Sequence, residues 1–335
     1  MKISRRSGSF LCKSGLFLAI CITLISWGKY GHEHINRAAV MSLPVPMQGF
    51  FYNHIDFMTV ESNLPDVRKY TLGDSAEFSR HHIHLESFGN IDSIPKSPKE
   101  AFAKYNAHFF AEHGMLPWYI QVMMDKLTIA FKGKHKSDIL LLAADLGHYI
   151  GDAYMPLHTS VNHNGKQTNQ VGIHALFESR LPELFGNTYH YNTGKVQYVA
   201  DIQKETWRIV MSSNSTADTL LKADRDLTAS FPAGKKWDRD AAGKVKLNMY
   251  KDSTGSIAYS KAFQTKLKGM VERQLRGAIA TTASFWYTAW VNAGKPDLNE
   301  LDPEELTQRN APALAQEKDL FKQGKLFGIK SEKEF

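Results

Sequence analysis

Cysteine is almost absent from this 335-residue chain, and the position of the few cysteines limits their use. The two that occur, Cys12 and Cys21, both lie within the first 26 residues. The rest of the chain therefore cannot form a disulfide, and it offers no thiolate to a metal ion. Its stability must come from a hydrophobic core and from any bound metal, and a hydrophobic content of 43% is sufficient for a sizeable core.

Acidic residues are missing from the first 26 residues, which contain four basic ones, Lys2, Arg5, Arg6 and Lys13. Behind them runs the apolar stretch LFLAICITLIS, which is too short to span a membrane. A basic head followed by such a run is typical of a secretory signal. We predict a signal peptide over residues 1–26, export to a periplasm or out of the cell, and a mature chain that begins at Trp27. Cys21 is alternatively a lipid attachment site.

A strong excess of one charge sign is also lacking once that segment is set aside. The formal net charge is +7, but the signal carries four of the 41 basic side chains and none of the 34 acidic ones, which leaves +3. Net charge is therefore no argument for a nucleic-acid partner. No segment implies a stable protein partner.

Alternating patterns typical of strands are scarce, and most of the chain after residue 27 has helical periodicity. Helices are expected over residues 34–43, 97–114, 118–134, 137–155, 172–185, 200–213 and 266–295. Residues 234–256 are expected to form a short hairpin or an ordered loop. Because no repeat or low-complexity linker occurs, we predict one compact all-α domain over residues 27–302, followed by a charged, partly mobile tail over 303–335.

Histidine is frequent, with 14 in the chain, and several histidines share a spacing. His148 and Asp152 are four residues apart, so both project from one face of the expected helix, and His174 and Glu178 repeat this spacing. His158 follows a proline that ends the first of these helices. Imidazole and carboxylate are usual donors to zinc, and burying so many ionisable groups without a cation is costly. The pattern therefore indicates a metal site rather than two helix-stabilising pairs.

The sequence neighbours of Asp145 and of the other histidines indicate whether these residues are candidate ligands. Asp145 shares the face of His148, either as a ligand or as a group that orients this imidazole. The stretches WGKYGHEHIN and SRHHIHLE offer further candidate ligands. The histidines without such company are expected at the surface or hydrogen-bonded in the core: His54, His108, His113, His135, His163 and His190.

The stretches WGKYGH, PDVRKY, RHHIHLE, GHYIGDAYMPLH and GIHALFE occur in this order over residues 27–178. As a set they resemble the zinc-dependent phospholipase C superfamily, which includes the secreted fungal-type single-strand-specific zinc nucleases. The resemblance implies an all-α fold with three zinc ions in a cleft. By position, the ions would be held by Asp66, His81, His148 and Asp152, by Trp27, His32 and the shared Asp152, and by His158, His174 and Glu178. A supporting role is expected for His34, His82 and His84.

The same resemblance implies hydrolysis of a phosphodiester by a zinc-bridged hydroxide that attacks phosphorus. Asp66 would guide the proton of the nucleophile, and Asp152 would bridge two ions. The amino group of Trp27 would become a ligand only after the signal is removed. Arg68 and Lys69 are both candidates for binding the substrate phosphate.

The expected substrate is a phospholipid, with single-stranded nucleic acid or a 3′-nucleotide as the alternative. Glu178 and GIHALFE resemble the phospholipase branch, and the absence of disulfides points the same way. Aromatic side chains available for stacking on a base are Phe88, Tyr154, Phe177 and Trp237. A hypothesis of another class is an exported protein without catalytic activity, in which zinc stabilises a disulfide-free fold.

Overall fold

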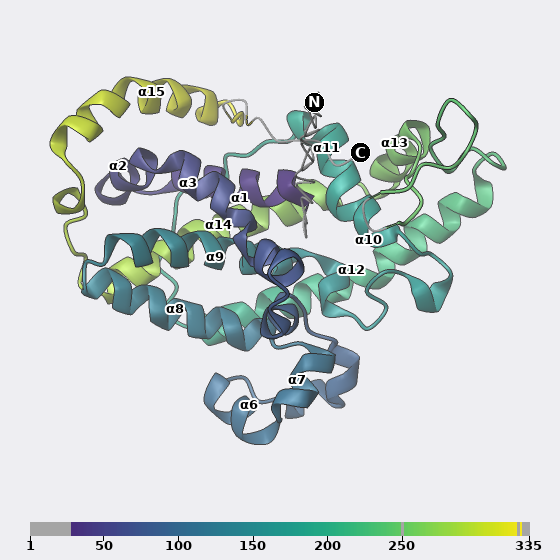
Figure 1. Cartoon of the computed structure of the whole chain (residues 1–335), viewed down its shortest axis with the longest axis horizontal. Coiled ribbons are helices and arrows are strands. Elements are labelled where there is room, and N and C mark those ends of the chain that lie inside the picture. Colours follow the sequence, from purple (N-terminus) through teal and green to yellow (C-terminus); the bar gives the residue numbers. More distant parts are fainter. Residues whose placement is uncertain (1–27, 249–250, 327–328, 330–335) are drawn as a thin grey trace, which may run out of the picture.

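Long helices packed side by side form the centre of the protein in the computed structural model, which describes residues 28–248, 251–326 and 329 (Figure 1). The central helices are α1 (Gly28–Ser42), α8 (Leu116–Lys132), α9 (Lys136–Tyr154), α12 (Ile202–Ser230) and α14 (Met270–Asn292). Each of the other four contacts α9, which makes α9 the middle of the bundle. The predicted all-α class is confirmed.

Shorter helices surround this bundle. They are α2 (Val45–Asn53), α3 (Ile55–Val60), α4 (Leu64–Asp66), α5 (Ser75–Phe78), α6 (Pro98–Lys104), α7 (Ala107–His113), α10 (Ile173–Ala175), α11 (Leu181–Phe185), α13 (Ile257–Lys266) and α15 (Glu304–Lys322). In Figure 1, α6 and α7 lie below the bundle and α15 lies above α2. Within the described residues, no helix is both long and apolar enough to cross a membrane.

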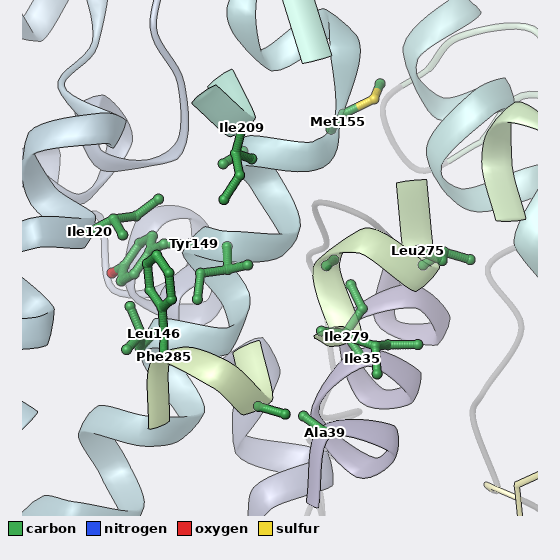
Figure 2. Packing of buried hydrophobic residues seen from close by; sticks show 14 of the residues in the cluster. Ile35, Ala39, Ile120, Leu146, Tyr149, Met155, Ile209, Leu275, Ile279 and Phe285 are labelled. Carbon is green, nitrogen blue, oxygen red and sulfur yellow. The ribbon is translucent and has the colours of Figure 1, made fainter. Parts of the chain in front are cut away.

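The core lies where α1, α9 and α14 meet (Figure 2). Ile35 of α1, Leu146 of α9 and Ile279 of α14 are fully buried there. Burying each such side chain stabilises the fold by about 1.5–3 kcal/mol. The indole of Trp286 on α14 is also fully buried, and its Nε1 donates a hydrogen bond to the carbonyl oxygen of Ala143 at 3.0 Å. The helix that carries His148 and Asp152 is thus held rigidly from two sides.

Two glycines of α9 allow α1 to approach closely. A Cβ atom added at Gly147 would overlap the Asn36 side chain, and one at Gly151 would lie 3.1 Å from the ring of His32. The amide of Asn36 cannot easily move away, because its Nδ2 donates to the carbonyl oxygens of Met58 and Ala144, each at 3.1 Å. Replacing either glycine would therefore disturb the position of α1 and of His32.

Replacing Gly147 by alanine is expected to destabilise the protein by about 2 kcal/mol, within the usual cost of about 1–3 kcal/mol for overpacking a core. Gly49 of α2 is the matched control, because a Cβ there would meet the Thr307 methyl group at an ordinary 4.0 Å. Gly49→Ala should instead stabilise by about 0.5–1 kcal/mol. Urea unfolding measures both changes, and equal stabilities would contradict the close approach.

The structure departs from the sequence prediction over residues 97–114 and in the tail. The helix expected over 97–114 is divided, because Tyr105 is extended and the Asn106 side chain accepts a hydrogen bond from Phe109 N, which starts α7 anew. Residues 303–335 were expected to form a partly mobile tail, yet α15 occupies much of this segment. It packs on α2, and Arg37 of α1 forms a buried ion pair with Glu317 of α15.

The described parts of the segment 234–256, residues 234–248 and 251–256, form an irregular hairpin, one of the two alternatives expected. Isolated antiparallel bridges join Trp237 to Gly255 and Leu247 to Ser253. One residue of this hairpin, Asp252, reaches back to the bundle, where Asn164 Nδ2 donates to its Oδ2 at 2.9 Å.

Candidate metal centre

The structure brings together eight of the nine residues expected to bind metal. Seven of them are at most 2% exposed, and His174 is partly buried. They come from α1, α4, the short turn Ser79–His81, α9, the turn Pro156–Thr159, α10 and the π-helical segment Leu176–Arg180: His32, Asp66, His81, His148, Asp152, His158, His174 and Glu178. The ninth, Trp27, lies outside the described residues.

Asp152 stands at the junction of two groups of imidazoles. Its Oδ2 lies 3.0 Å from His81 Nδ1 and 3.4 Å from His148 Nε2. Its Oδ1 lies 3.7 Å from His32 Nε2 and 3.3 Å from His158 Nδ1. One carboxylate thus faces nitrogen atoms of four histidines, which is the arrangement that a shared metal ligand requires.

In the first group, two imidazole nitrogens lie close together. His148 Nδ1 donates to the carbonyl oxygen of Ser62 at 2.7 Å, which leaves the lone pair of the neutral ring on Nε2. This Nε2 lies 3.1 Å from His81 Nδ1, while the other nitrogen of His81 faces Glu77 Oε1 at 3.6 Å. When His81 carries its proton on Nε2, both of these nitrogens offer a lone pair to a cation. The Oδ1 atom of Asp66 is 3.6 Å from the same His81 nitrogen.

The second group repeats the same arrangement. His174 Nδ1 donates to the carbonyl oxygen of His163 at 3.0 Å, so the lone pair of the neutral ring lies on Nε2. That atom is 3.3 Å from His158 Nε2 and 2.6 Å from Glu178 Oε2. Glu178 Oε1 is in turn 3.6 Å from His158 Nε2. Both groups are therefore buried clusters of nitrogen and oxygen donors that can hold a metal ion.

Burial keeps two of these imidazoles neutral, as a metal ligand must be. It lowers the pKa of His32 to about 4 and that of His148 well below its usual value. The two rings also stack, with centroids 3.8 Å apart. His34, the alternative to His32, lies elsewhere: its Nδ1 is 2.6 Å from the carbonyl oxygen of Tyr30, and its ring stacks on Tyr30.

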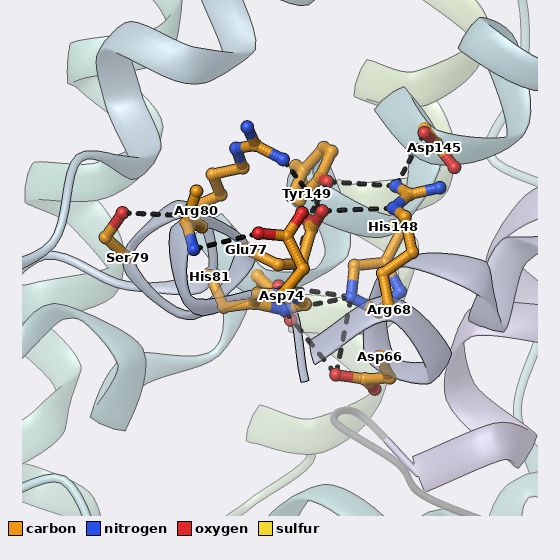
Figure 3. A network of polar contacts seen from close by, with 12 residues as sticks. Asp66, Arg68, Asp74, Glu77, Ser79, Arg80, His81, Asp145, His148 and Tyr149 are labelled. Atoms are coloured by element: carbon orange, nitrogen blue, oxygen red, sulfur yellow. Dashed lines mark hydrogen bonds and ion pairs between the residues drawn. The ribbon is translucent and has the colours of Figure 1, made fainter. Parts of the chain in front are cut away.

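Glu77 of α5 is a partner of this site that the sequence reasoning missed (Figure 3). Besides facing His81, it accepts hydrogen bonds from Arg68 Nε at 3.0 Å, from Arg80 Nη1 at 2.8 Å and from the Tyr149 hydroxyl. A carboxylate behind a ligand imidazole fixes the ring and raises its basicity. The four-residue spacing between Glu77 and His81 was the signal that could have identified it.

Replacing Glu77 by glutamine is expected to destabilise the protein by about 2 kcal/mol at neutral pH, because the hydrogen bonds from charged donors are weakened. Burial raises the pKa of Glu77, but hydrogen bonds from His81 and Tyr149 and the charge of Arg68 outweigh it and lower this pKa to about 2. The stabilisation is thus present above the unfolded pKa, near 4.5, and is lost as the pH falls towards 2. Urea unfolding of both proteins between pH 7 and pH 3 checks this, and a difference that grows at low pH would contradict it.

Arg68 and Asp145 pair with each other. Arg68 Nη2 donates to Asp145 Oδ2 at 2.7 Å, and Arg68 also pairs with Glu77. Asp145 was expected to bind metal or to orient His148, but that imidazole is held by the carbonyl of Ser62 instead. Of the two cations expected to bind phosphate, the structure places Arg68 in this ion-pair network and Lys69 in the wall of a cavity.

This cavity, of about 520 Å³, opens beside both groups of ligands. His81, His158 and His174 lie in its wall, together with Lys69 and Lys166. His82 and His84, expected to support the ligands, also line it. None of the aromatic residues proposed for base stacking does so. The aromatic residues in the described cavity wall are Tyr70 and Phe78, which are 39% and 50% exposed.

Lys69 lies between these two aromatic rings. Its Nζ atom is 4.5 Å from the centre of the Tyr70 ring and 5.1 Å from that of Phe78. Burial lowers the pKa of Lys69, but Tyr70 and Asp66 outweigh it, so the pKa rises and the amine stays charged. The cavity thus offers one fixed cation close to the metal ligands.

A scan against models of known protein families finds no match to this chain, and a search of curated proteins finds no similar sequence. The resemblance to the zinc-dependent phospholipase C superfamily therefore rests on the motif residues alone.

Proposed function

We propose that the protein is an exported zinc-dependent phosphodiester hydrolase of the phospholipase C and single-strand nuclease type. The observation that carries this proposal is the position of Asp152, whose two oxygens face imidazoles of both ligand groups beside an open cavity. A carboxylate shared between ions is typical of sites that hold several metals for hydrolysis. A lone structural site would need neither the shared ligand nor the cavity.

Zinc fits these residues because the donors are imidazole nitrogens and carboxylate oxygens, with close pairs of acceptor nitrogens. Three ions are proposed: one on Asp66, His81, His148 and Asp152, a second on His32, Asp152 and the residue at position 27, and a third on His158, His174 and Glu178. When bound, such ions neutralise phosphate charge and lower the pKa of water.

The protein's own residues would position the substrate and move a proton. Lys69 would bind a phosphate oxygen, because its amine lies in the cavity wall and stays charged. The nearby carboxylates of Asp66 and Asp152 help to raise the pKa of this amine. Asp66 would accept the proton of the attacking water, because its Oδ1 lies 3.6 Å from the ligand nitrogen His81 Nδ1. Asp152 would fix the position of the two ligand groups relative to each other, because its two oxygens face imidazoles of both.

The rim of the cavity supports a phospholipid as the substrate. Phe78 and Val161 are 50% and 39% exposed, and both line the cavity. Exposed apolar side chains around a polar pocket are suited to contact with a lipid surface. Tyr70 and Phe78 would serve base stacking in the alternative, a single-strand nuclease or 3′-nucleotidase.

The test is an assay of the mature, zinc-loaded protein on phosphatidylcholine vesicles, single-stranded DNA and a 3′-nucleotide. Release of phosphocholine is expected, and release of nucleotides alone would replace the lipid substrate with the alternative. No cleavage of any phosphodiester would leave zinc a structural role. Determining the N-terminal residue of the exported protein checks the proposed start at Trp27.

A further inference from the structure

His163 was expected at the surface or in the core, but its ring lies against the second ligand group. A ring nitrogen of His163 and those of His158 and His174 lie within 4.8 Å of one another. The ring centre of His163 is 5.0 Å from that of His158 and 4.3 Å from that of His174. One nitrogen from each of three imidazoles therefore lies close to those of the other two, where the family pattern supplies two imidazoles.

One ring nitrogen of His163 makes no hydrogen bond to the described residues. This atom, Nδ1, is buried. An unsatisfied buried polar atom costs about 1–3 kcal/mol, and such costs are usually avoided. A nitrogen lone pair that faces neither water nor a donor is suited to a metal ion.

The backbone around His163 is fixed, which holds the ring in place before any ion binds. Asn162 Oδ1 accepts a hydrogen bond from Gln167 N at 2.9 Å, and Asn164 Oδ1 accepts one from Gly172 N at 3.1 Å. The side chain of Asn164 is also bound to Asp252 of the hairpin. Both neighbours of His163 in sequence are thus anchored through their side chains.

We propose that His163 is a fourth protein ligand of the metal ion held by His158, His174 and Glu178. This inference rests on the proposed metal centre but adds a ligand to it. Three imidazoles and one carboxylate complete the four-coordinate set that zinc takes in structural sites, whereas a catalytic site keeps one position for water. The ion in this group thus anchors the segment 156–178, and the attacking water belongs to the group around Asp66 and His148.

The test compares metal binding by the wild-type protein and His163→Ala. This variant keeps the backbone carbonyl of His163 that receives the hydrogen bond from His174, so it removes the ring alone. We expect the wild type to retain three zinc ions during dialysis against a competing chelator, and the variant to retain two. The affinity for the lost ion should fall by at least about 10–100-fold. Even residues that only hydrogen-bond to a metal ligand change metal affinity by that much.

Two further variants distinguish ligation from packing. His113→Ala removes a partly buried imidazole that lies in neither the cavity wall nor a ligand group, and it should retain all three ions. His163→Asp supplies a different donor and should restore part of the affinity, which a loss of packing would not allow. Circular dichroism establishes that each variant is folded.

Substitution with cobalt(II) gives a readout independent of hydrolysis. A four-coordinate cobalt site absorbs visible light more strongly than a five- or six-coordinate one, so the spectrum of His163→Ala should lose intensity. Unchanged zinc affinity and an unchanged cobalt spectrum in this variant would overturn the proposal. If the wild type binds metal but cleaves no phosphodiester, the proposed function fails and His163 remains a ligand.

Discussion

Replacing Asp152 by asparagine is expected to abolish hydrolysis and to remove metal from both ligand groups. Its two oxygens face nitrogens of four histidines, so one substitution weakens both groups at once. Asparagine keeps the size of the side chain but lacks the charge that offsets the cations. Groups that only support a ligand contribute about 10–100-fold to metal affinity or activity, so loss of this shared ligand should cost more than about 100-fold.

Metal content and turnover of the purified variant measure this effect together. Asp138→Asn is the matched control, because Asp138 lies on the same helix, is 62% exposed and pairs with the exposed His135 at 3.6 Å. The control should retain its metal and change stability by less than about 1 kcal/mol. An Asp152→Asn protein with full metal content and turnover would refute the bridging role.

Removing the metal is expected to lower the melting temperature by about 10 °C or more. Bound cations would neutralise the buried carboxylates of both ligand groups, and no disulfide within residues 28–335 holds the fold together in their place. A ligand present at 1,000 times its dissociation constant stabilises by about 4 kcal/mol. Each kcal/mol shifts the melting temperature of a larger domain by about 2–4 °C.

Calorimetry of the protein before and after dialysis with a chelator measures this shift. Adding zinc back should restore the original melting temperature, and magnesium should not, because it binds imidazole poorly. A His148→Ala variant should respond much less to the chelator. Equal melting temperatures of the loaded and stripped wild type would mean that the fold does not depend on metal.

The pairs within the ligand groups could be predicted because residues four apart in a helix project from the same face. His148 and Asp152 share a face of α9, and His174 and Glu178 are brought together by α10 and the segment after it. That these two pairs converge was a matter of tertiary packing, for which the family resemblance supplied the expectation. The order of the motifs did not show where Glu77 would lie.

The missed features depend on contacts between distant segments. Arg68 and Lys69 are neighbours in sequence, yet Arg68 pairs with Asp145 across 77 residues and Lys69 lines the cavity. His163 had no acidic or histidine neighbour in sequence to mark it. The tail helix α15 is stabilised by contacts with α2 and by the ion pair to Arg37, so its own mixed charge pattern was a poor guide.

The hairpin contributes to the cavity wall from a part of the sequence that is separate from the candidate metal ligands. Every described ligand lies between residues 32 and 178, whereas Asp252 reaches the same cavity from a later segment that supplies none of them. Surface connections tolerate changes of length and sequence far better than packed helices do. Under the proposed function, we expect substitutions in the hairpin to alter substrate selectivity without disturbing the candidate metal ligands.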